Sequence, residues 1–267
     1  MVRILDCTIR DGGHLTDWNF ADELVRDTFE AAKACGVTYF EIGYRNHGDG
    51  KFAKCFNEDL HSIIPDKGDV KLGVMVNARE FLEDLFFEGD YADVVRIACH
   101  PNEISQGIEY CKILEDKNYE PILHLMDVAH ISDEQFRDLK QYDADKLLYF
   151  ADSYGALLPK DIKDCFKLFN SRGFYNLGFH GHNNKQLAFI NTLTAIDCGA
   201  ASVDVTVYGM GRAAGNTPAE LLLNEIGMPS RPYFDLIEKY YINLHKQNPW
   251  GYSLKNLSGG ISNSKVV

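Results

Sequence analysis

Two histidines separated by one glycine, His180 and His182, carry the strongest chemical signal in this 267-residue sequence. On a β-strand, residues i and i+2 point to the same side, so the two imidazoles would project side by side. That arrangement suits a divalent metal, although two histidines that bond to neighbouring carboxylates would give the same pattern. Asp11 precedes two glycines and offers a third ligand, with a turn or capping aspartate as the alternative. Two imidazoles and a carboxylate would leave open positions and suit Mg, Mn, Co, Zn or Fe(II).

Two further residues close to Asp11 have side chains that could do chemistry. Arg10 could stabilise a developing enolate or hold a carboxylate through two hydrogen bonds. His14 could take a proton from a substrate hydroxyl. Without the surrounding motif, His14 would read as an exposed loop histidine. The cluster therefore predicts proton transfer and anion stabilisation beside a metal.

The elements that must position these residues alternate regularly along the chain. Strand-like segments followed by helices require parallel pairing with right-handed crossovers. Eight such units predict an α/β fold of the (β/α)8 TIM-barrel type, and a doubly wound open sheet is the alternative. No glycine-rich dinucleotide turn follows the first strand, which favours the barrel. The predicted strands are 2–9, 38–43, 70–76, 92–99, 121–126, 146–151, 176–182 and 202–207. The predicted helices are 19–35, 53–64, 79–88, 103–117, 132–142, 159–172, 185–198 and 217–226.

Barrel enzymes carry their chemistry at the carboxyl ends of the strands, and this sequence places polar side chains there. The residues at or beyond strand ends are Arg10, Asp11, His14, His100, Asp127, Ser153, His180, His182, Tyr208 and Arg212. Glu41 lies within the second strand. The alternation and the polar strand ends thus predict one site at one mouth of the barrel.

The composition excludes several classes of protein. Hydrophobic residues make up 45% and charged residues 25%, as in an ordinary globular protein. The formal net charge of −12 disfavours a nucleic-acid partner. No apolar run is long enough to predict a membrane span, and the first residues do not resemble a signal peptide. Seven scattered cysteines without a C-x-x-C motif favour reduced thiols, so we expect a cytoplasmic protein.

Three runs in order along the chain give the sequence a family resemblance. They are DCTIRDG at 6–12, HGHNN at 180–184 and GMGRAAGN at 209–216. The chain resembles the metal-dependent lyase and synthase barrels that include 4-hydroxy-2-oxovalerate aldolase, hydroxymethylglutaryl-CoA lyase and isopropylmalate synthase. Three signatures on the expected strands are far more specific than any one of them.

The resemblance implies a role for each matching residue. The metal ligands would be Asp11, His180 and His182, with Asn216 completing the shell. Arg10 would stabilise the enolate oxygen, Glu41 would hold that arginine, and His14 would be the catalytic base. The metal would be Mn²⁺ or Mg²⁺, with Co²⁺ or Zn²⁺ as alternatives. The residues expected to bind the substrate are His100, Ser153, Tyr208 and Arg212.

The spacing from Arg10 to His14 resembles the pyruvate-forming aldolases, whereas the synthases usually have Glu-Gln after this run. The resemblance implies a divalent-metal-dependent aldolase that cleaves or forms a 4-hydroxy-2-oxo acid through a pyruvate enolate. A Claisen-type acyl-CoA synthase or acyl-CoA lyase is the nearest alternative. A phosphate-binding barrel and a catalytically silent binding module are two others. Arg45 departs from the aldolase pattern and would add a cation at the mouth.

The length suggests a catalytic barrel over 1–230 and a C-terminal helical extension over 231–267. The extension should begin with a helix over 233–246 and end in a polar, irregular tail. The expected partner is a small 2-oxo acid, and a homodimer is compatible with the sequence. Related aldolases commonly carry a further C-terminal region, so we expect the chain to be part of a longer protein or to lack a partner domain.

Overall fold

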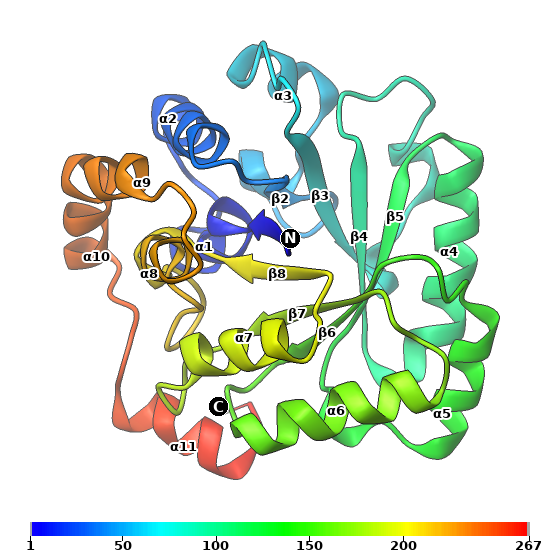
Figure 1. The fold of residues 1–267 in the computed structure, drawn as a ribbon. Helices are drawn as coiled ribbons and strands as arrows, with labels where there is room; N and C mark the ends of the chain where they lie inside the picture. Colours follow the sequence, from blue (N-terminus) through cyan, green and yellow to red (C-terminus); the bar gives the residue numbers. More distant parts are fainter. Residues whose placement is uncertain (1, 266–267) are drawn as a thin grey trace.

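The computed structural model describes residues 2–265, which form a closed barrel of eight parallel strands (Figure 1). Each strand pairs with the next along the chain, and the last pairs back with the first, where Arg3 lies opposite Ser202. The predicted (β/α)8 barrel is therefore confirmed. The strands are β1 (Arg3–Asp6), β2 (Tyr39–Tyr44), β3 (Lys71–Asn77), β4 (Val94–Cys99), β5 (Glu120–Leu125), β6 (Leu148–Asp152), β7 (Leu177–Gly181) and β8 (Ser202–Val205).

Helices surround this barrel, and their apolar faces pack on the outside of the strands (Figure 1). In α2, for example, Leu24, Val25 and Phe29 recur at three- to four-residue intervals and are buried. The helices are α1 (Thr8–Thr16), α2 (Asp22–Ala34), α3 (Asn57–Ile63), α4 (Ile104–Asp116), α5 (Asp133–Asp138), α6 (Pro159–Ser171), α7 (Ala188–Asp197), α8 (Ala219–Glu225), α9 (Arg231–Leu236), α10 (Ile242–Gln247) and α11 (Leu254–Ser262). None of those within residues 2–265 is long and apolar enough to span a membrane.

The first strand is shorter than predicted, because the chain turns into a helix at Thr8. The carboxylate of Asp6 accepts hydrogen bonds from the backbone N–H of Thr8, at 2.8 Å, and from its hydroxyl. The bond from the Thr8 backbone satisfies an N–H at the start of α1 that has no partner within the helix. As a result, Arg10, Asp11 and His14 lie on a short helix at the barrel mouth, and not on a loop.

The helix predicted over 79–88 is absent, and two short 3₁₀ turns, Ala78–Glu80 and Glu83–Leu85, replace it. Lys117 Nζ donates to the carbonyls of Glu83, at 3.2 Å, and Phe86, at 2.8 Å. Phe86 is 1% exposed and lies under the Arg45 guanidinium. Burial of this aromatic ring therefore overrides the helical spacing of the segment.

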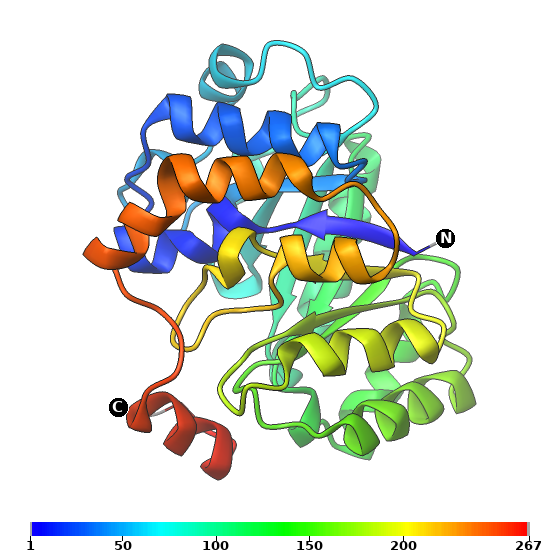
Figure 2. The same cartoon turned by 60° about the vertical axis from the view of Figure 1, so that its left-hand side comes forward.

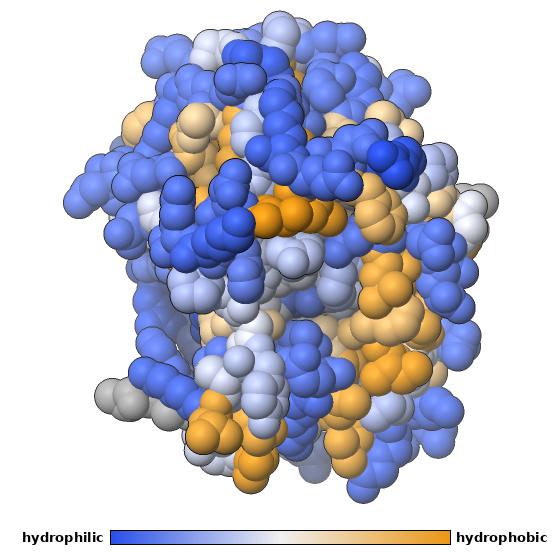
Figure 3. Space-filling view, turned by 90° about the vertical axis from the view of Figure 1, so that its left-hand side faces the viewer, coloured by the Kyte–Doolittle hydropathy of each residue, from blue (hydrophilic) through white to orange (hydrophobic). Residues whose placement is uncertain are grey.

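The C-terminal helical stretch packs closely on the barrel. It consists of α9, a π-helical turn over Ile237–Tyr241 and α10, and it lies alongside α2 (Figures 1 and 2). The Tyr233 hydroxyl donates to Asp6 Oδ2 at 2.6 Å, and the Tyr241 hydroxyl lies 2.9 Å from Thr28 Oγ1. Figure 3 shows the face that the C-terminal helices form, on which apolar patches lie among hydrophilic side chains.

Residues Leu254–Ser262 form a helix, α11, where the sequence suggests an irregular tail. The Ser253 hydroxyl accepts a hydrogen bond from the backbone N–H of Asn256 at 3.1 Å, which caps the start of α11. Gly259 and Gly260 are buried, so the glycines serve close packing here.

Candidate active site

A cavity of about 240 Å³ lies at the carboxyl ends of the barrel strands. Its position is the one at which barrel enzymes carry their chemistry. The predicted site residues that line it are Arg10, Asp11, His14, His100, Ser153, His180, His182 and Arg212. The fold thus brings together side chains from β1 through β8 at one mouth.

Arg10 is buried at the base of this cavity. Its Nε donates to Glu41 Oε2 at 2.6 Å, and its Nη1 donates to Asp11 Oδ2 at 3.0 Å. Burial lowers the pKa of Arg10, but the carboxylates of Glu41 and Asp11 outweigh burial and raise it well above its ordinary value. Nη2 is buried and has no hydrogen-bond partner within residues 2–265. Arg10 therefore carries a fixed positive charge with one donor that no protein group among the described residues satisfies.

Glu41 connects Arg10 to a second buried arginine. Arg96 of β4 donates from Nε to Glu41 Oε1 at 2.8 Å and from Nη1 to Asp204 Oδ2 at 2.6 Å. Buried charges that lose a partner are strongly destabilising, so this network holds each member in place. Through Glu41, it fixes the orientation of Arg10.

His180 is held on both ring nitrogens. Its Nδ1 lies 2.7 Å from Asp204 Oδ2, and its Nε2 lies 3.3 Å from Asp11 Oδ2. Burial lowers the pKa of His180, but hydrogen bonds to Asp11 and Asp204 outweigh it, so the pKa is raised. A carboxylate on one ring nitrogen is how proteins orient a histidine that binds a metal with the other.

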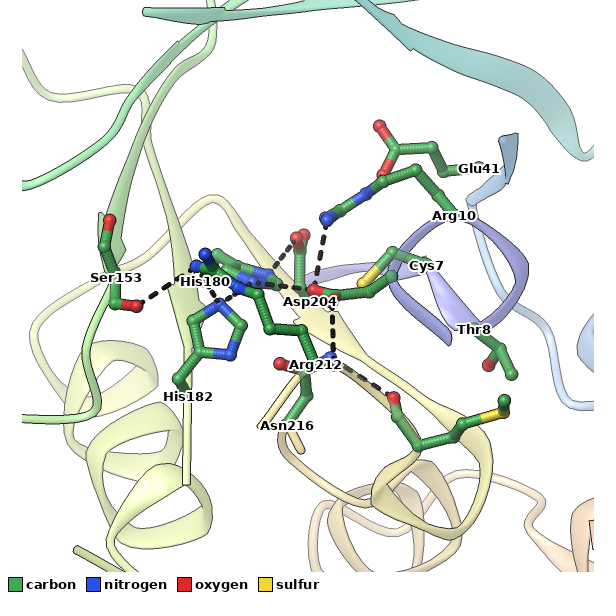
Figure 4. A network of polar contacts seen from close by, with 12 residues as sticks. Cys7, Thr8, Arg10, Glu41, Ser153, His180, His182, Asp204, Arg212 and Asn216 are labelled. Carbon is green, nitrogen blue, oxygen red and sulfur yellow. Dashed lines mark hydrogen bonds and ion pairs between the residues drawn. The ribbon is translucent and has the colours of Figure 1, made fainter. Parts of the chain in front are cut away.

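The second histidine faces the first, with His180 Nε2 and His182 Nε2 3.4 Å apart (Figure 4). Burial and the nearby Arg212 charge lower the pKa of His182, which keeps a lone pair on its neutral ring. Asn216 adds an oxygen, because His182 and Asn216 form an antiparallel bridge and Asn216 Oδ1 is buried without a hydrogen-bond partner within residues 2–265. His180 thus links Asp11 on one side to His182 on the other, and these imidazoles and the carboxylate, with the buried amide oxygen of Asn216, are donors of the types that suit a divalent metal ion.

Cys7 is an additional candidate that sequence reasoning missed. Ligand atoms of Cys7, Asp11 and His180 lie within 4.8 Å of one another in residues 2–265. The Cys7 thiol, however, donates toward the Val205 carbonyl, and burial raises its pKa well above the ordinary value. A thiolate is the ligand form of cysteine, whereas His182 places Nε2 3.4 Å from His180 Nε2, so the cluster has two candidate third partners.

The glycine-rich run after β8 shapes the Asn216 side of the cluster. A Cβ atom at Gly211 would lie 2.3 Å from Asn216 Nδ2. The Asn183 N–H donates to the Gly215 carbonyl at 2.9 Å, which ties this run to the loop after β7. The small residues therefore allow Asn216 to lie against the histidine strand.

His14 lies at the open end of the cavity, on the last turn of α1. The surrounding protein atoms lower the pKa of His14, as do the charges of Arg212 and Arg10, which favours the neutral imidazole, and the residue itself is exposed. Its ring centroid lies 5.7 Å from that of His47. His47 in turn places Nδ1 2.8 Å from Glu80 Oε2, an orientation that no pattern in the sequence indicated.

The substrate-binding candidates divide into three that line the cavity and one that does not. Ser153, His100 and Arg212 line it, and Arg212 Nη2 lies 3.2 Å from the Ser153 carbonyl and 3.3 Å from His182 Nε2 (Figure 4). Tyr208 lines neither this cavity nor the one beside it.

The positions of Tyr208 and Arg45 differ from those expected. The Tyr208 backbone has φ = +55°, and its ring packs against His245 and Trp250 outside the cavity. Arg45 is 2% exposed, pairs with Asp90 and points away from the mouth, because Phe86 and the carbonyl of Cys55 enclose it. Neither side chain lines the candidate active-site cavity in this arrangement.

Arg96 and Asp204 complete the site without having been assigned a role from the sequence. Each is a single charged residue inside an apolar strand, and such a residue must have a partner when it is buried. That signal marks them as paired, but it does not identify the partner.

Comparisons with known proteins agree with this geometry. The HMGL-like family model matches residues 125–230. The chain is 34% identical over 238 residues to a 4-hydroxy-2-oxovalerate aldolase of Carboxydothermus hydrogenoformans, which covers 83% of this chain and 69% of the relative. It is 30% identical over 236 residues to an oxaloacetate decarboxylase of Mycobacterium tuberculosis, covering 82% of this chain and 68% of that protein.

Solved structures show the same fold. The N-terminal domain of a proposed aldolase from Bacteroides vulgatus superposes with a TM-score of 0.89 at 29% identity, covering 98% of this chain and 93% of that one. The HMG-CoA lyase of Bacillus subtilis has a TM-score of 0.72 at 17% identity, covering 96% and 97%, and shows the fold alone. The barrel and its relatives define an enzyme of the aldolase and lyase type. The chain belongs to the HMGL-like family.

Proposed function

We propose that this enzyme is a divalent-metal-dependent aldolase that cleaves or forms a 4-hydroxy-2-oxo acid through a pyruvate enolate. The observation that carries the proposal is the free Nη2 of the buried Arg10 beside the cluster of Asp11, His180 and His182. A fixed cation stabilises an enolate because it is already oriented where negative charge develops. The relatives named 4-hydroxy-2-oxovalerate aldolase support the same substrate class.

Asp11, His180, His182 and Asn216 would hold the metal. We propose Mn²⁺ or Mg²⁺, with Co²⁺ or Zn²⁺ as substitutes, because the donors combine hard oxygens with imidazole. When bound, such an ion supplies a Lewis acid that polarises the 2-oxo group. Asp204 would act on the site only by orienting His180.

The remaining steps belong to side chains of this chain. His14 is neutral at pH 7 and takes the 4-hydroxyl proton as the C3–C4 bond breaks and the aldehyde leaves. Arg10 Nη2 donates to the enolate oxygen of the pyruvate fragment, while Glu41 and Arg96 keep its guanidinium in position. The enolate is then protonated at C3 and pyruvate is released. In the reverse direction, C3 of the enolate attacks the aldehyde carbon and His14 returns the proton.

Replacing the acidic ligand tests this function. Asp11→Asn should lose essentially all pyruvate release from 4-hydroxy-2-oxopentanoate, and it should bind Mn²⁺ more weakly, because one carboxylate is lost from the cluster. Both effects are measured on the purified chain, pyruvate by a coupled dehydrogenase assay and Mn²⁺ by calorimetry. Asp127→Asn, which changes a carboxylate that does not line the cavity, is the matched control. Full activity in Asp11→Asn, or no pyruvate from a panel of 4-hydroxy-2-oxo acids with the wild-type chain, would overturn the proposal.

A further inference from the structure

A second cavity, of about 380 Å³, adjoins the candidate active site. The two cavities share Ser153, His182 and Arg212 as lining residues, so the second begins where the first ends. Its outer wall is the C-terminal segment, which leaves α10 in an extended stretch and ends in α11 (Figure 2). The chain end therefore extends the space available beyond the reacting centre.

This wall is held in place by specific contacts. Asn184, in the loop directly after the histidine motif, donates from Nδ2 to the Asn256 carbonyl at 2.9 Å. Gly260 lies so close to the barrel loops that an added Cβ would be 3.0 Å from Asn184 Cβ and 3.2 Å from the Gly155 carbonyl. The helix α11 therefore packs against the loop that follows His182, so the wall of the second cavity is in contact with the segment that carries a candidate metal ligand.

The charge of the second cavity is opposite to that of the chain. Its lining includes three cationic residues, Arg212, Lys255 and Lys265, and no carboxylate side chain among residues 2–265. The protein as a whole has a net charge of −12. Within residues 2–265, the ammonium groups of Lys255 and Lys265 have no ion-pair or hydrogen-bond partner. Lys239, by contrast, pairs with Asp27. A local positive field in an acidic protein attracts an anionic group.

We propose that the second cavity binds the aldehyde half of the substrate, and that this half carries a carboxylate or phosphate at the end remote from the reacting carbon. The inference rests on the proposed aldolase function, since it assigns the second cavity to the part of the same substrate that leaves as aldehyde. Arg212 lies at the junction of the cavities and, with Lys255 and Lys265, supplies the positive charge that recognises the anion.

The test uses condensation of pyruvate with matched aldehydes. Succinic semialdehyde is compared with butanal, and glyceraldehyde 3-phosphate with glyceraldehyde, so that each pair differs by one anionic group. The wild-type chain should have a higher kcat/KM for the anionic member of at least one pair, and the pair with the larger ratio tells carboxylate from phosphate. Added salt should reduce that ratio, because it screens the exposed lysine charges.

The double variant Lys255→Met/Lys265→Met removes the two lysine charges but keeps most of the side-chain volume. The ratio of kcat/KM for the anionic over the neutral aldehyde should fall about tenfold, as expected for the loss of two partly exposed charge pairs. Lys167→Met, at an exposed lysine on α6 that does not line this cavity, should leave the ratio unchanged. Thermal unfolding of the variants verifies that the fold is retained.

The outcomes separate this inference from the proposed function. No condensation with any aldehyde would overturn the aldolase proposal itself. Condensation with neutral aldehydes, without preference for either anionic partner, would overturn the anion site and leave the aldolase intact. An anionic preference that the double variant retains in full would also overturn the assignment to Lys255 and Lys265.

Discussion

Single residues in this site act through charges that are buried and paired. Arg10 is held by Glu41, Glu41 by Arg96, and Arg96 by Asp204, which also holds His180. Removing one member would leave its partner charged and unpaired in the interior, which costs several kcal/mol in comparable systems. Within residues 2–265, Arg10 Nη2 is the donor of this network that has no hydrogen-bond partner, and the Arg10 side chain lines the cavity.

The role of His14 as base gives a prediction at this scale. His14→Ala should lower kcat for pyruvate release by about 10²–10⁴-fold, because the 4-hydroxyl proton then has no positioned acceptor. The measurement is steady-state kinetics across pH on the metal-loaded chain. His47→Ala is the comparison variant, since His47 lines the same cavity and carries the carboxylate partner Glu80. Near-normal activity of His14→Ala together with a large loss in His47→Ala would assign the base to His47.

Eight of the 18 residues that line the cavity could be chosen from the sequence, because they are reactive side chains at the ends of barrel strands. Tyr208 was chosen for the same reason and lies elsewhere, since its positive φ turns the side chain toward Trp250. The rotation of one residue at the end of a strand decides which way its side chain points. The order of residue types along the chain does not predict that backbone rotation.

At the scale of elements, two short segments shape the cluster. The helix α1 starts directly after β1, where the Thr8 N–H donates to the Asp6 carboxylate, and it places Arg10 and Asp11 at the mouth. The glycine-rich run after β8 brings Asn216 against His182. Helical periodicity alone predicts neither segment. The start of α1 involves the Asp6 side chain, and the run after β8 depends on glycines that have no side chain.

Gly211 tests the role of the glycine-rich run. Gly211→Ala should weaken Mn²⁺ binding by about 10–100-fold, the range seen when partners of metal ligands are changed, because the new methyl group must displace the Asn216 amide 2.3 Å away. Calorimetric titration of the metal-free chain measures the affinity. Gly48→Ala is the matched control, as its Cβ would meet only Ala53 at an ordinary 3.5 Å. Equal Mn²⁺ affinity in both variants would remove Asn216 from the proposed ligand set.

At the scale of the whole molecule, the C-terminal helices are joined to the centre of the barrel through Asp6. Tyr233 of α9 donates to Asp6 Oδ2, while the other oxygen of the same carboxylate caps α1. One buried group therefore connects β1, α1 and α9. Burial raises the pKa of Asp6 to about 6, against the lowering effect of these hydrogen bonds.

This raised pKa predicts how stability depends on pH. The folded chain holds the Asp6 proton more tightly than the unfolded chain, so the contribution is fully present below about pH 4 and is lost as pH rises through about 6. In Asp6→Asn that loss should be absent, and the variant should gain up to about 3 kcal/mol relative to wild type between pH 4 and pH 7. Denaturant unfolding at several pH values measures the difference. A stability difference that is constant with pH would show that Asp6 keeps its ordinary pKa in the folded chain.

The sequence by itself determined the barrel, the family and eight of the 18 cavity-lining residues. Alternating strand and helix periodicity specifies a parallel barrel, and a barrel gathers strand ends at one mouth whatever the details of packing. Only the tertiary structure decided which side chains pair, where Tyr208 points, and that the polar tail forms α11 as the wall of a second cavity. Those features depend on contacts between residues distant in the chain, such as Asn184 with Asn256, and local periodicity carries no information about such contacts.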